Sequence, residues 1–482
     1  MKKAELVFIP TPGISHLVST VEVAKLLVDR DERLSITFLI MKLRSDPKID
    51  RFINSVSTAC NRIRFIDLPK DEPDPNQPRK FLFSLIEAQI PHVKEEVFKL
   101  VSQSESSPDS PPLAGFVLDM FCTSMIDVAT EFGVPSYIFF TSGAAFLGLQ
   151  FYVQDLHDEQ KVDPTEFKGS DAELVMPCLA NPLPAKVLPS VMLNKEWLPP
   201  VLRQARRFRE SKGIIINTFE ELESHAMDSF SKGNTPPVYP VGPILNLNRD
   251  DGDGDEESDK RKDIKQWLDD QPLSSVVYLC FGSMGSFGVD QVKEIACGLE
   301  QSGHRFSWSL RKPQPKGKME IPSDYTNPQD VLPEGFLDRT AKIGKIIGWG
   351  PEIDILSHPS VGGFVSHCGW SSILESIWFG VPIAAWPIQA EQQLNAFQII
   401  VELGFGVEIK MDCRREFFYD DNENIISAGE IERGIRCLME IGKEKVERLK
   451  EMSEQSRKAL MEGGCSNTWL GQLIHEMVDN IP

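Results

Sequence analysis

A histidine and an aspartate in the N-terminal part of the chain have the types and positions of an acid–base pair. His16 lies in the segment Pro10-Thr11-Pro12-Gly13-Ile14-Ser15-His16-Leu17, which follows the apolar run 6–9, so we expect it to begin a helix after a strand. Asp119 ends a second apolar run, 116–118. A neutral imidazole accepts protons near pH 7, and a neighbouring carboxylate would fix its tautomer. Each residue alone also has a purely structural explanation, as a helix-start histidine or an N-cap aspartate.

The segment 349–392 holds the densest polar chemistry. Within it, an expected strand at 362–365 leads into Ser366-His367-Cys368-Gly369-Trp370-Ser371-Ser372, which opens a helix. The free N–H groups and positive dipole of such a helix start bind anions. His367, Ser371 and Ser372 add side-chain donors, so the pattern fits a diphosphate, although Ser371 could instead be a simple N-cap.

The elements that position these residues alternate between strand and helix in two successive series. Expected strands cover residues 6–9, 34–40, 116–118, 136–140, 276–281, 306–310, 344–347, 362–365 and 381–386, and helices cover 17–27, 289–301 and the region after the capping-box spacing Ser427-x-x-Glu430. This alternation predicts parallel sheets with crossover helices, whose ligands bind at the carboxyl ends of the strands. We therefore predict an α/β protein with two doubly wound, Rossmann-like domains that face a cleft.

The predicted domains are residues 1–245 and 264–482, separated by an acidic linker or loop at 246–263, with the C-terminal helix packing back on the first domain. The linker contains Asp251-Gly-Asp253-Gly-Asp255, which superficially resembles a calcium loop. Such a loop needs glycine at its sixth position and glutamate at its twelfth, where this chain has Glu256 and Lys262. We therefore expect no metal site.

Bulk properties restrict the partners. The chain has 482 residues and a formal net charge of −20, so no basic surplus exists to neutralise the phosphates of a nucleic acid. No apolar stretch approaches the roughly 18 residues of a membrane span. The nine cysteines form no C-x-x-C pair, which favours buried free thiols in a reducing compartment. We expect a cytoplasmic monomer.

The whole of segment 349–392 resembles the signature block of the plant secondary-metabolite UDP-glycosyltransferases, the family 1 glycosyltransferases with a GT-B fold. Further motifs agree with this resemblance: Pro-x-Pro-Gly-x-x-His-Leu at 10–17, Gly-Ile-Ile-Ile-Asn-Thr-Phe-Glu-Glu-Leu-Glu at 213–223, Tyr-Pro-Val-Gly-Pro at 239–243 and Phe-Gly-Ser-x-Gly-Ser at 281–286. The resemblance therefore spans almost the entire chain. It implies an inverting enzyme in which domain 264–482 binds a UDP-sugar and domain 1–245 binds the acceptor.

The resemblance also assigns roles to the donor residues. Trp349 would stack on uracil, and Glu375 would bind the ribose hydroxyls. Ser283, His367, Ser372 and the backbone around Gly369 would hold the diphosphate. Trp370, Glu391 and Gln392 would bind the sugar, and a glutamine at the position of Gln392 favours UDP-glucose. Gly350, Glu352 and Ser371 complete this donor set.

Three positions depart from the family pattern. Glu352 stands where the family has glutamine, Ser371 where it has asparagine, and Ser15 where it has glycine. Glu352 places a negative charge near a nucleotide unless it points outward, and Ser371 is too short to reach everything that an asparagine reaches. These departures bear on sugar identity and donor affinity.

On the acceptor side, the resemblance implies that His16 deprotonates a hydroxyl while Asp119 orients the imidazole. Candidate acceptor contacts are Phe121, Thr141, Ser142, Phe146 and Met192. The predicted reaction is transfer of glucose from UDP-glucose to a hydroxyl of a small lipophilic acceptor, a phenolic, flavonoid or terpenoid, without cofactor or metal. Formation of a glucosyl ester on a carboxylic acid remains an alternative.

Two other classes of protein fit the sequence less well. A nicotinamide-dependent oxidoreductase would carry Gly-x-Gly-x-x-Gly after the first strand and an acid about 20 residues later, but this turn reads Pro-Thr-Pro-Gly-Ile-Ser-His. A non-catalytic carrier of nucleotide-sugars or lipophilic ligands has no need for His16 together with Asp119.

Overall fold

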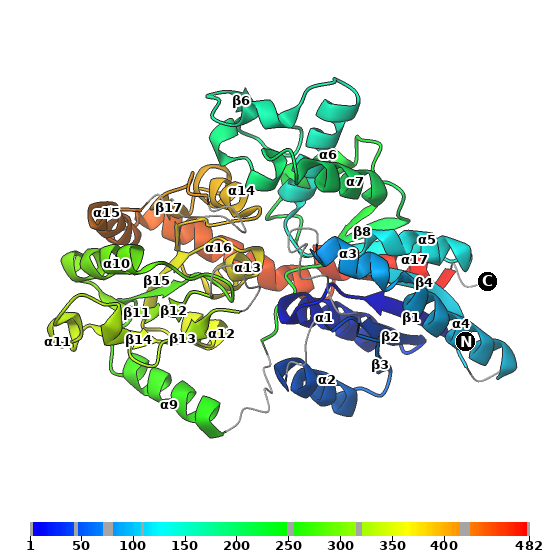
Figure 1. The fold of residues 1–482 in the computed structure, drawn as a ribbon, viewed down its shortest axis with the longest axis horizontal. Coiled ribbons are helices and arrows are strands. Elements are labelled where there is room, and N and C mark those ends of the chain that lie inside the picture. The colour runs from blue at the N-terminus through cyan, green and yellow to red at the C-terminus, as the bar shows by residue number, and fades with distance from the viewer. Residues whose placement is uncertain are drawn as a thin grey trace. The chain divides into compact units, whose positions relative to one another are not determined.

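The computed structural model describes residues 3–42, 47–70, 81–107, 110–247, 255–314, 321–414 and 425–479. Its contacts divide the chain into two compact units. Unit 1 consists of Met1–Val162, Pro199–Gly252 and Lys458–Pro482, and unit 2 consists of Asp163–Leu198 and Asp253–Arg457. Each unit is built around one parallel sheet (Figure 1).

The sheet of unit 1 has seven strands in the order β3-β2-β1-β4-β5-β8-β9, all paired in parallel. The strands are β1 (Ala4–Ile9), β2 (Leu34–Ile40), β3 (Ile63–Asp67), β4 (Leu113–Asp119), β5 (Ser136–Phe140), β8 (Gly213–Ile216) and β9 (Val238–Pro240). The helices are α1 (Ile14–Arg30), α2 (Pro47–Ala59), α3 (Phe81–Ala88), α4 (Ile90–Ser106), α5 (Ile126–Glu131), α6 (Ala144–Asp158), α7 (Leu198–Phe208), α8 (Ser224–Phe230) and α17 (Cys465–Asp479).

The order of the strands reverses between β1 and β4, and this creates a switch point. From β1 the chain moves outward to β2 and β3, then returns to β4 on the other side of β1. Every residue of β1 and of β4 is buried, as expected for strands covered by helices on both faces. At such a switch point the loops after the two central strands diverge and leave room for a ligand at their carboxyl ends.

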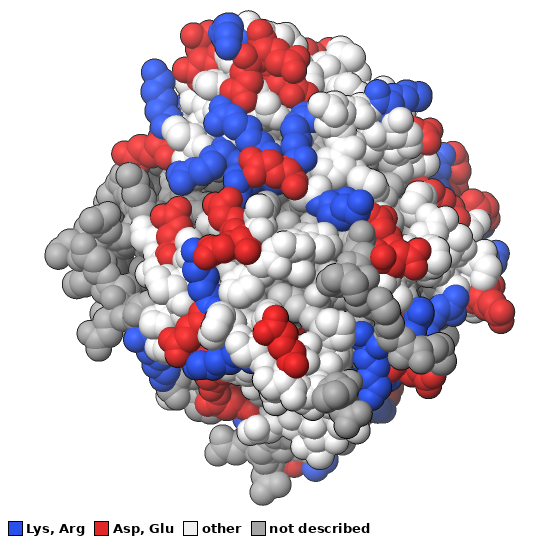
Figure 2. All heavy atoms as spheres, turned by 90° about the vertical axis from the view of Figure 1, so that its right-hand side faces the viewer, with Lys and Arg blue, Asp and Glu red and all other residues white. Residues whose placement is uncertain are grey.

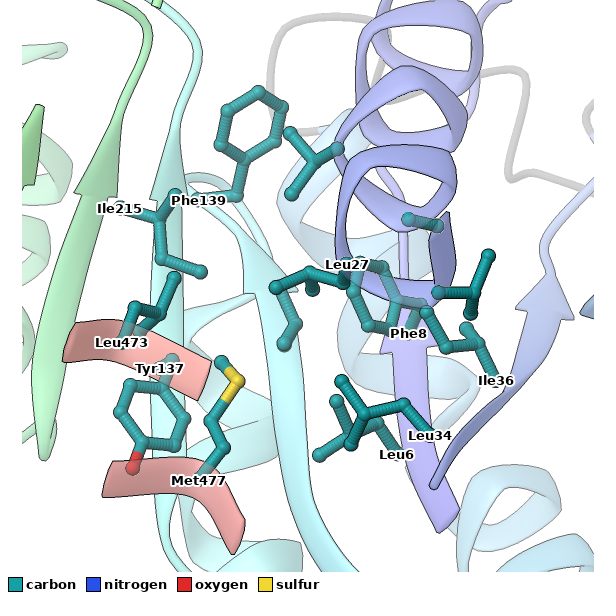
Figure 3. Packing of buried hydrophobic residues seen from close by; sticks show 14 of the residues in the cluster. Leu6, Phe8, Leu27, Leu34, Ile36, Tyr137, Phe139, Ile215, Leu473 and Met477 are labelled. Carbon is teal, nitrogen blue, oxygen red and sulfur yellow. The ribbon is translucent and has the colours of Figure 1, made fainter. Parts of the chain in front are cut away.

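The C-terminal helix α17 is part of the core of unit 1. Its residues Leu473 and Met477 are fully buried in the same apolar cluster as Tyr137 and Ile215, which come from β5 and β8, and Figure 3 shows these side chains side by side. Tyr239 of β9 also donates a hydrogen bond to Glu476. Residues of α17 and of β1 therefore belong to the same hydrophobic core.

The sheet of unit 2 repeats the arrangement with six parallel strands in the order β14-β11-β10-β15-β16-β17. The strands are β10 (Val276–Cys280), β11 (Arg305–Ser309), β14 (Gly344–Ile347), β15 (Val361–Ser366), β16 (Ile383–Ala385) and β17 (Gly406–Glu408). The helices are α9 (Asp255–Asp269), α10 (Val289–Ser302), α11 (Phe336–Thr340), α12 (Glu352–Leu356), α13 (Trp370–Phe379), α14 (Gln392–Phe397), α15 (Ala428–Met439) and α16 (Lys443–Leu460). The switch point lies between β10 and β15.

Two short antiparallel pairs complete unit 2. Strands β12 (Arg311–Lys312) and β13 (Ser323–Asp324) form one pair, and β6 (Glu173–Leu174) and β7 (Leu183–Pro184) form the other. The second pair belongs to the early segment Asp163–Leu198, which is fixed to later elements of unit 2. The carboxylate of Glu402 accepts the backbone N–H groups of Ala180 and Asn181 at 2.9 and 2.8 Å.

The structure agrees with most of the expected elements. Strands 34–40, 136–140 and 344–347 have the expected bounds, and Ser427 caps α15 through a complete capping box with Glu430. The prediction of an α/β protein with two doubly wound parallel sheets is confirmed. Helix α9 begins at Asp255, inside the expected linker 246–263, and residues 248–254 lie outside the described residues, together with most of the calcium-like motif.

The surface carries charged side chains of both signs. Basic and acidic side chains are mixed on the face shown in Figure 2, and arginines of α7 are paired, as in Arg206–Asp158 at 2.5 Å and Arg207–Asp127 at 2.7 Å. Within the described residues no helix is long and apolar enough to cross a bilayer. The nine cysteines are free, but Cys437 is exposed, so the expectation of buried thiols is wrong there.

The packing of α17 yields a prediction about stability. Leu473 is fully buried, so Leu473→Ala leaves a cavity and should lower the free energy of unfolding of unit 1 by about 2–5 kcal/mol. His475→Ala on the same helix is the control, because that side chain is 78% exposed and its surface ion pair contributes little. Urea unfolding of the three proteins measures the difference. Equal midpoints for Leu473→Ala and the wild type would mean that α17 is not part of the core.

Candidate functional site

The carboxyl ends of β1 and β4 bring His16 and Asp119 together. His16 lies in the first turn of α1, and Asp119 is the last residue of β4. The Nδ1 atom of His16 is 2.7 Å from Oδ2 of Asp119. The Asp119 side chain is completely buried, whereas that of His16 is 25% exposed. The two residues therefore have the geometry of a dyad whose imidazole remains accessible at one side.

Hydrogen bonds hold the Asp119 carboxylate on its other oxygen. The hydroxyl of Thr11 donates to Oδ1 at 2.5 Å, and the backbone N–H of Phe121 donates to the same atom at 3.1 Å. The thiol of Cys122 lies 3.6 Å from the Thr11 hydroxyl oxygen. A buried carboxylate is stable only with such partners. Thr11 was not among the expected site residues, although its position between two prolines in the histidine motif was a usable signal.

The expected acceptor residues occupy different surroundings. The Phe121 ring lies edge-on to the His16 ring, with centroids 5.7 Å apart, and a second aromatic ring, that of Phe83, lies 6.2 Å from Phe121. Phe146 is nearly buried in α6 and packs on Phe140. Of the expected set, Phe121 is therefore the residue that the structure brings to the dyad.

The remaining acceptor candidates are less open. Thr141 follows β5, and its hydroxyl donates to the sulfur of Met120 at 3.3 Å, while Ser142 is buried. Met192 ends a short turn in unit 2 and is fully buried there. In the structure as it stands, Met192 therefore presents no surface to a ligand.

A buried glutamate that the sequence analysis did not single out fixes the loop after β5. The two carboxylate oxygens of Glu223 accept the N–H groups of Ala144 and Ala145 at 2.7 and 2.9 Å. These are the first N–H groups of α6, so Glu223 occupies the anion-binding end of that helix. This contact sets the position of Thr141 and Ser142. Glu223 belongs to the segment 213–223 that carried part of the resemblance.

In unit 2, His367 lies between two glycines at the switch point. A Cβ atom at Gly282, in the loop after β10, would be 2.5 Å from His367 Nε2, and so would a Cβ atom at Gly369. Gly282 also has a φ of +73°, which disfavours other residues. Glycine is thus required on both sides of this imidazole. The Nδ1 atom of His367 is buried without a partner among the described residues, as expected for a group that binds a ligand or water.

The start of α13 has the form expected of an anion site. Gly369 is the N-cap residue, and the N–H groups of Trp370, Ser371 and Ser372 open the ten-residue helix. Ser371 is exposed, Ser372 and Trp370 are nearly buried, and Glu375 is partly exposed one turn along. Ser283 is exposed in the loop after the neighbouring strand β10. The structure therefore brings Ser283, His367, Gly369 and Ser372 to adjacent strand ends.

The segment after β14 is supported by a side chain with no sequence signal. Asp324 of β13 accepts the backbone N–H of Trp349 at 2.9 Å and pairs with the guanidinium of Arg311 at 3.2 Å. A Cβ atom at Gly348 would lie 2.3 Å from this carboxylate. Asp324 therefore fixes the backbone that carries Trp349, and Gly350 follows directly in a buried position.

Glu352, one of the departures from the family pattern, points inward. At the start of α12, its Oε2 atom accepts the thiol of Cys280 at 3.4 Å. Burial and the neighbouring Glu352 raise the pKa of the Cys280 thiol well above its usual range, so it remains a donor. The extra charge of Glu352 is therefore directed toward the end of β10.

Glu391 and Gln392 stand at the start of α14. The side-chain oxygen of Gln392 accepts the N–H groups of Ile388 and Gln389, each at 2.9 Å. With its oxygen used in this way, the Gln392 side chain offers its NH₂ group to a ligand. Glu391, the residue before the helix, is partly exposed.

Unit 1 also contains a cavity away from the dyad. A cavity of about 200 Å³ lies at the opposite, amino edge of the unit 1 sheet, beside Glu5, Ser35 and Arg64. The Glu5 carboxylate there already accepts hydrogen bonds from Ser35 and Thr37. Within the described ranges no group of three or more histidine, cysteine, aspartate or glutamate side chains could hold a metal ion.

Comparison with known proteins gives one consistent result. The family model described as UDP-glucoronosyl and UDP-glucosyl transferase matches residues 217–415. An anthocyanidin 3-O-glucosyltransferase 1 from Manihot esculenta is 56% identical over 467 residues, which cover 96% of this chain and 100% of the relative.

Two solved structures extend the likeness to the fold. A ugt transferase from Siraitia grosvenorii in complex with UDP has a TM-score of 0.88 and 48% identity, and the match covers 99% of this chain and 100% of that one. UGT71G1 from Medicago truncatula, complexed with UDP-glucose, has a TM-score of 0.86 and 40% identity over 98% of both chains. The predicted GT-B fold is thereby confirmed.

Burial of His367 makes stability depend on pH. Burial lowers the pKa of this imidazole from 6.5 to about 4, so the unfolded chain takes up a proton before the folded protein does. The free energy of unfolding should therefore fall as the pH decreases from about 6.5 to about 4. Urea unfolding at several pH values should show a steeper fall for the wild type than for His367→Gln. Parallel curves would contradict the shifted pKa.

Proposed function

The chain belongs to the plant UDP-glycosyltransferases, enzymes that transfer a hexosyl group from a UDP-sugar to a small acceptor, and we propose that it transfers glucose from UDP-glucose to a hydroxyl of a lipophilic phenolic. The observation that carries this proposal is the contact between His16 and Asp119 at a strand switch point. Relatives named as anthocyanidin and flavonoid 3-O-glucosyltransferases support a flavonoid-like acceptor.

Unit 2 is proposed to bind the donor. Trp349 would stack on uracil, and Glu375 would accept hydrogen bonds from the ribose hydroxyls. The helix start at Gly369, with His367, Ser372 and Ser283, would hold the diphosphate. His367 is suited to this role because it stays neutral at physiological pH and carries a buried ring nitrogen with no partner among the described residues.

The sugar would be bound by Trp370, Glu391 and Gln392. The NH₂ group of Gln392 is a hydrogen-bond donor for a sugar hydroxyl, because the side-chain oxygen is already used by the backbone. Ser371, Gly350 and Glu352 complete the proposed donor set. Glu352 is compatible with a bound nucleotide because its carboxylate is engaged with Cys280.

The proposed mechanism is a direct displacement. The acceptor hydroxyl gives its proton to Nε2 of His16, while the Nδ1–H donates to Asp119, which stabilises the imidazolium that forms. The acceptor oxygen forms a bond to the anomeric carbon as the bond to the diphosphate oxygen breaks, so the configuration inverts from α to β. Charge on the departing UDP is met by the α13 N-terminus and its hydroxyl donors.

In this scheme unit 1 holds the acceptor. Phe121 beside His16 supplies an aromatic face, and Thr141, Ser142 and Phe146 belong to the proposed wall, whereas Met192 would need to become exposed before it could contact an acceptor. We further propose that the enzyme works in the cytosol, a reducing compartment in which its nine cysteines stay free thiols. We also propose that it is a monomer and needs no cofactor or metal.

Replacement of His16 tests the base assignment. His16→Ala should lower kcat by about 10²- to 10⁴-fold with an alcohol or phenol acceptor, because no other group takes up the proton. Binding of UDP, measured by calorimetry, should be unchanged, since the diphosphate contacts lie in unit 2. Glu22→Gln on the same helix is the control and should retain full turnover. Turnover near that of the wild type in His16→Ala would show that His16 is not the base.

A substrate panel tests the reaction itself. UDP-glucose, UDP-galactose and UDP-glucuronate are each combined with a flavonol, a simple phenol and an aromatic acid, and UDP release and product mass are recorded. We expect the fastest UDP release with UDP-glucose and the flavonol, and an alkali-stable product whose anomeric proton is of the β type. Preference for another donor, or an alkali-labile ester as the main product, would refute that part of the proposal. A carrier would release no UDP with any acceptor.

A further inference from the structure

The hydroxyl of Thr11 is placed to act on the dyad without touching a substrate. Thr11 is 3% exposed and Asp119 is fully buried. The hydroxyl donates to Oδ1 of Asp119 at 2.5 Å, while Oδ2 of the same carboxylate faces Nδ1 of His16 at 2.7 Å. A change at Thr11 therefore reaches the imidazole through one carboxylate.

The sequence around Thr11 makes this hydroxyl a rigid donor. Pro10 and Pro12 flank it, so its own backbone is held in the extended region and its neighbours have fixed φ angles. Gly13 follows with a φ of 139°, which turns the chain into α1 and places His16 in the first turn. The same short segment thus positions both the donor to Oδ1 and the imidazole at Oδ2.

Cys122 supports the orientation of the hydroxyl. Burial and the charge of Asp119 raise the pKa of the Cys122 thiol well above its usual range, so it stays protonated. Its sulfur is 3.6 Å from the Thr11 oxygen, close enough for the S–H group to donate weakly to that oxygen. The Thr11 hydrogen is then directed to the carboxylate.

We propose that Thr11 is a positioning residue of the catalytic dyad, whose hydroxyl orients the Asp119 carboxylate and limits how strongly that carboxylate attracts the proton on His16. This inference rests on the proposed role of His16 as general base. A hydrogen bond to one carboxylate oxygen disperses negative charge that would otherwise act on the imidazolium at the other oxygen.

Loss of this hydroxyl has a defined direction of effect. Without the Thr11 donor, the Asp119 carboxylate interacts more strongly with the imidazolium, so the pKa of His16 rises and more of the enzyme is protonated at a given pH. The acid limb of the kcat/KM profile then moves to higher pH. The carboxylate also loses one of the two donors to its Oδ1 atom and keeps only the Phe121 N–H there, so Nδ1 of His16 is less well oriented.

Other ionisable groups lie on or beside α1, among them the Lys25–Glu22 pair of α1 itself and the His475–Asp479 pair of α17. Strand β2, which packs against α1, has the sequence LSITFLI and carries no ionisable side chain. Helix α17 also packs against α1, and its Glu476 accepts the hydroxyl of Tyr239. The ring beside His16 is the uncharged Phe121. These groups are the same in the wild type and in the Thr11 variants, so a shift of the acid limb that follows loss of the hydroxyl reports on Asp119, the carboxylate that the hydroxyl contacts.

The test compares Thr11→Val with Thr11→Ser. Valine has nearly the shape of threonine but cannot donate, so kcat should fall about 10- to 100-fold and the acid limb of kcat/KM should rise by about 0.5 pH unit. Serine retains the donor and should restore both quantities. Thr37→Val is the matched control, because its buried hydroxyl also donates to a carboxylate, that of Glu5, which is not part of the dyad; its acid limb should stay within error of the wild type. UDP binding should be the same in all of them.

The outcomes separate this inference from the proposed function. If His16→Ala turns over normally, the base assignment fails whatever Thr11→Val does. If His16→Ala is slow but Thr11→Val keeps the wild-type kcat and acid limb, Thr11 does not act on the dyad. If Thr11→Val and Thr11→Ser lose activity equally with an unmoved limb, the role of Thr11 is structural and the inference is overturned.

Discussion

The buried carboxylate of Asp119 sets the main constraint on unit 1, because a charge without water is stable only where hydrogen bonds replace its hydration. Three donors meet this need: the Thr11 hydroxyl, the Phe121 N–H and the His16 imidazole. Each comes from a segment that directly follows or ends a central strand. The loop after β1 and the end of β4 therefore cannot move independently, and the position of His16 depends on both.

Unit 2 is built on the same sheet topology. Its sheet has the same reversal of strand order, and the loop after β10 and the turn after β15 meet around His367. In unit 1 a hydrogen-bonded imidazole and carboxylate lie at the switch point, whereas in unit 2 two glycines make room for the His367 imidazole. In the proposed function, one sheet edge serves proton transfer and the other holds an anion. This difference in side chains, and not the fold itself, is the basis for proposing a separate task for each unit.

Sequence patterns were sufficient for the fold class and for the placement of His16 and Asp119. Apolar runs bounded by Gly and Pro located most of the central strands, and the placement of His16 after β1 and of Asp119 at the end of β4 followed from the rule for parallel sheets. The edge strands β3, β9 and β17 were not predicted, because these short strands lack a continuous apolar run. The inner strand β8 was not predicted either, although its sequence GIII is apolar throughout. Helix α9 was taken for a linker because its sequence, DEESDKRKDIKQWLD, is charged on most sides.

Contacts between residues far apart in the chain could not be predicted from the sequence. Asp324 supports Trp349 across 25 positions, and Glu223 caps α6 from 79 positions away. Nothing local marks either carboxylate, since each looks like a surface acid until the partner N–H groups are placed. Thr11 lay inside a recognised motif, yet its partner Asp119 is 108 positions away. Such support residues become visible only once the tertiary structure is known.

The departures Glu352 and Ser371 show how the local surroundings decide the effect of a substitution. A carboxylate in place of an amide repels a nucleotide less when a donor lies against it, and Oε2 of Glu352 accepts a hydrogen bond from the Cys280 thiol, which burial keeps protonated. The thiol hydrogen bond therefore compensates part of the Glu352 charge before any ligand binds. Ser371 is exposed at the first turn of α13, where backbone N–H groups already provide donors. The shorter side chain leaves the dipole and the backbone donors of this helix start in place, so the proposed anion site depends more on the fold than on that residue.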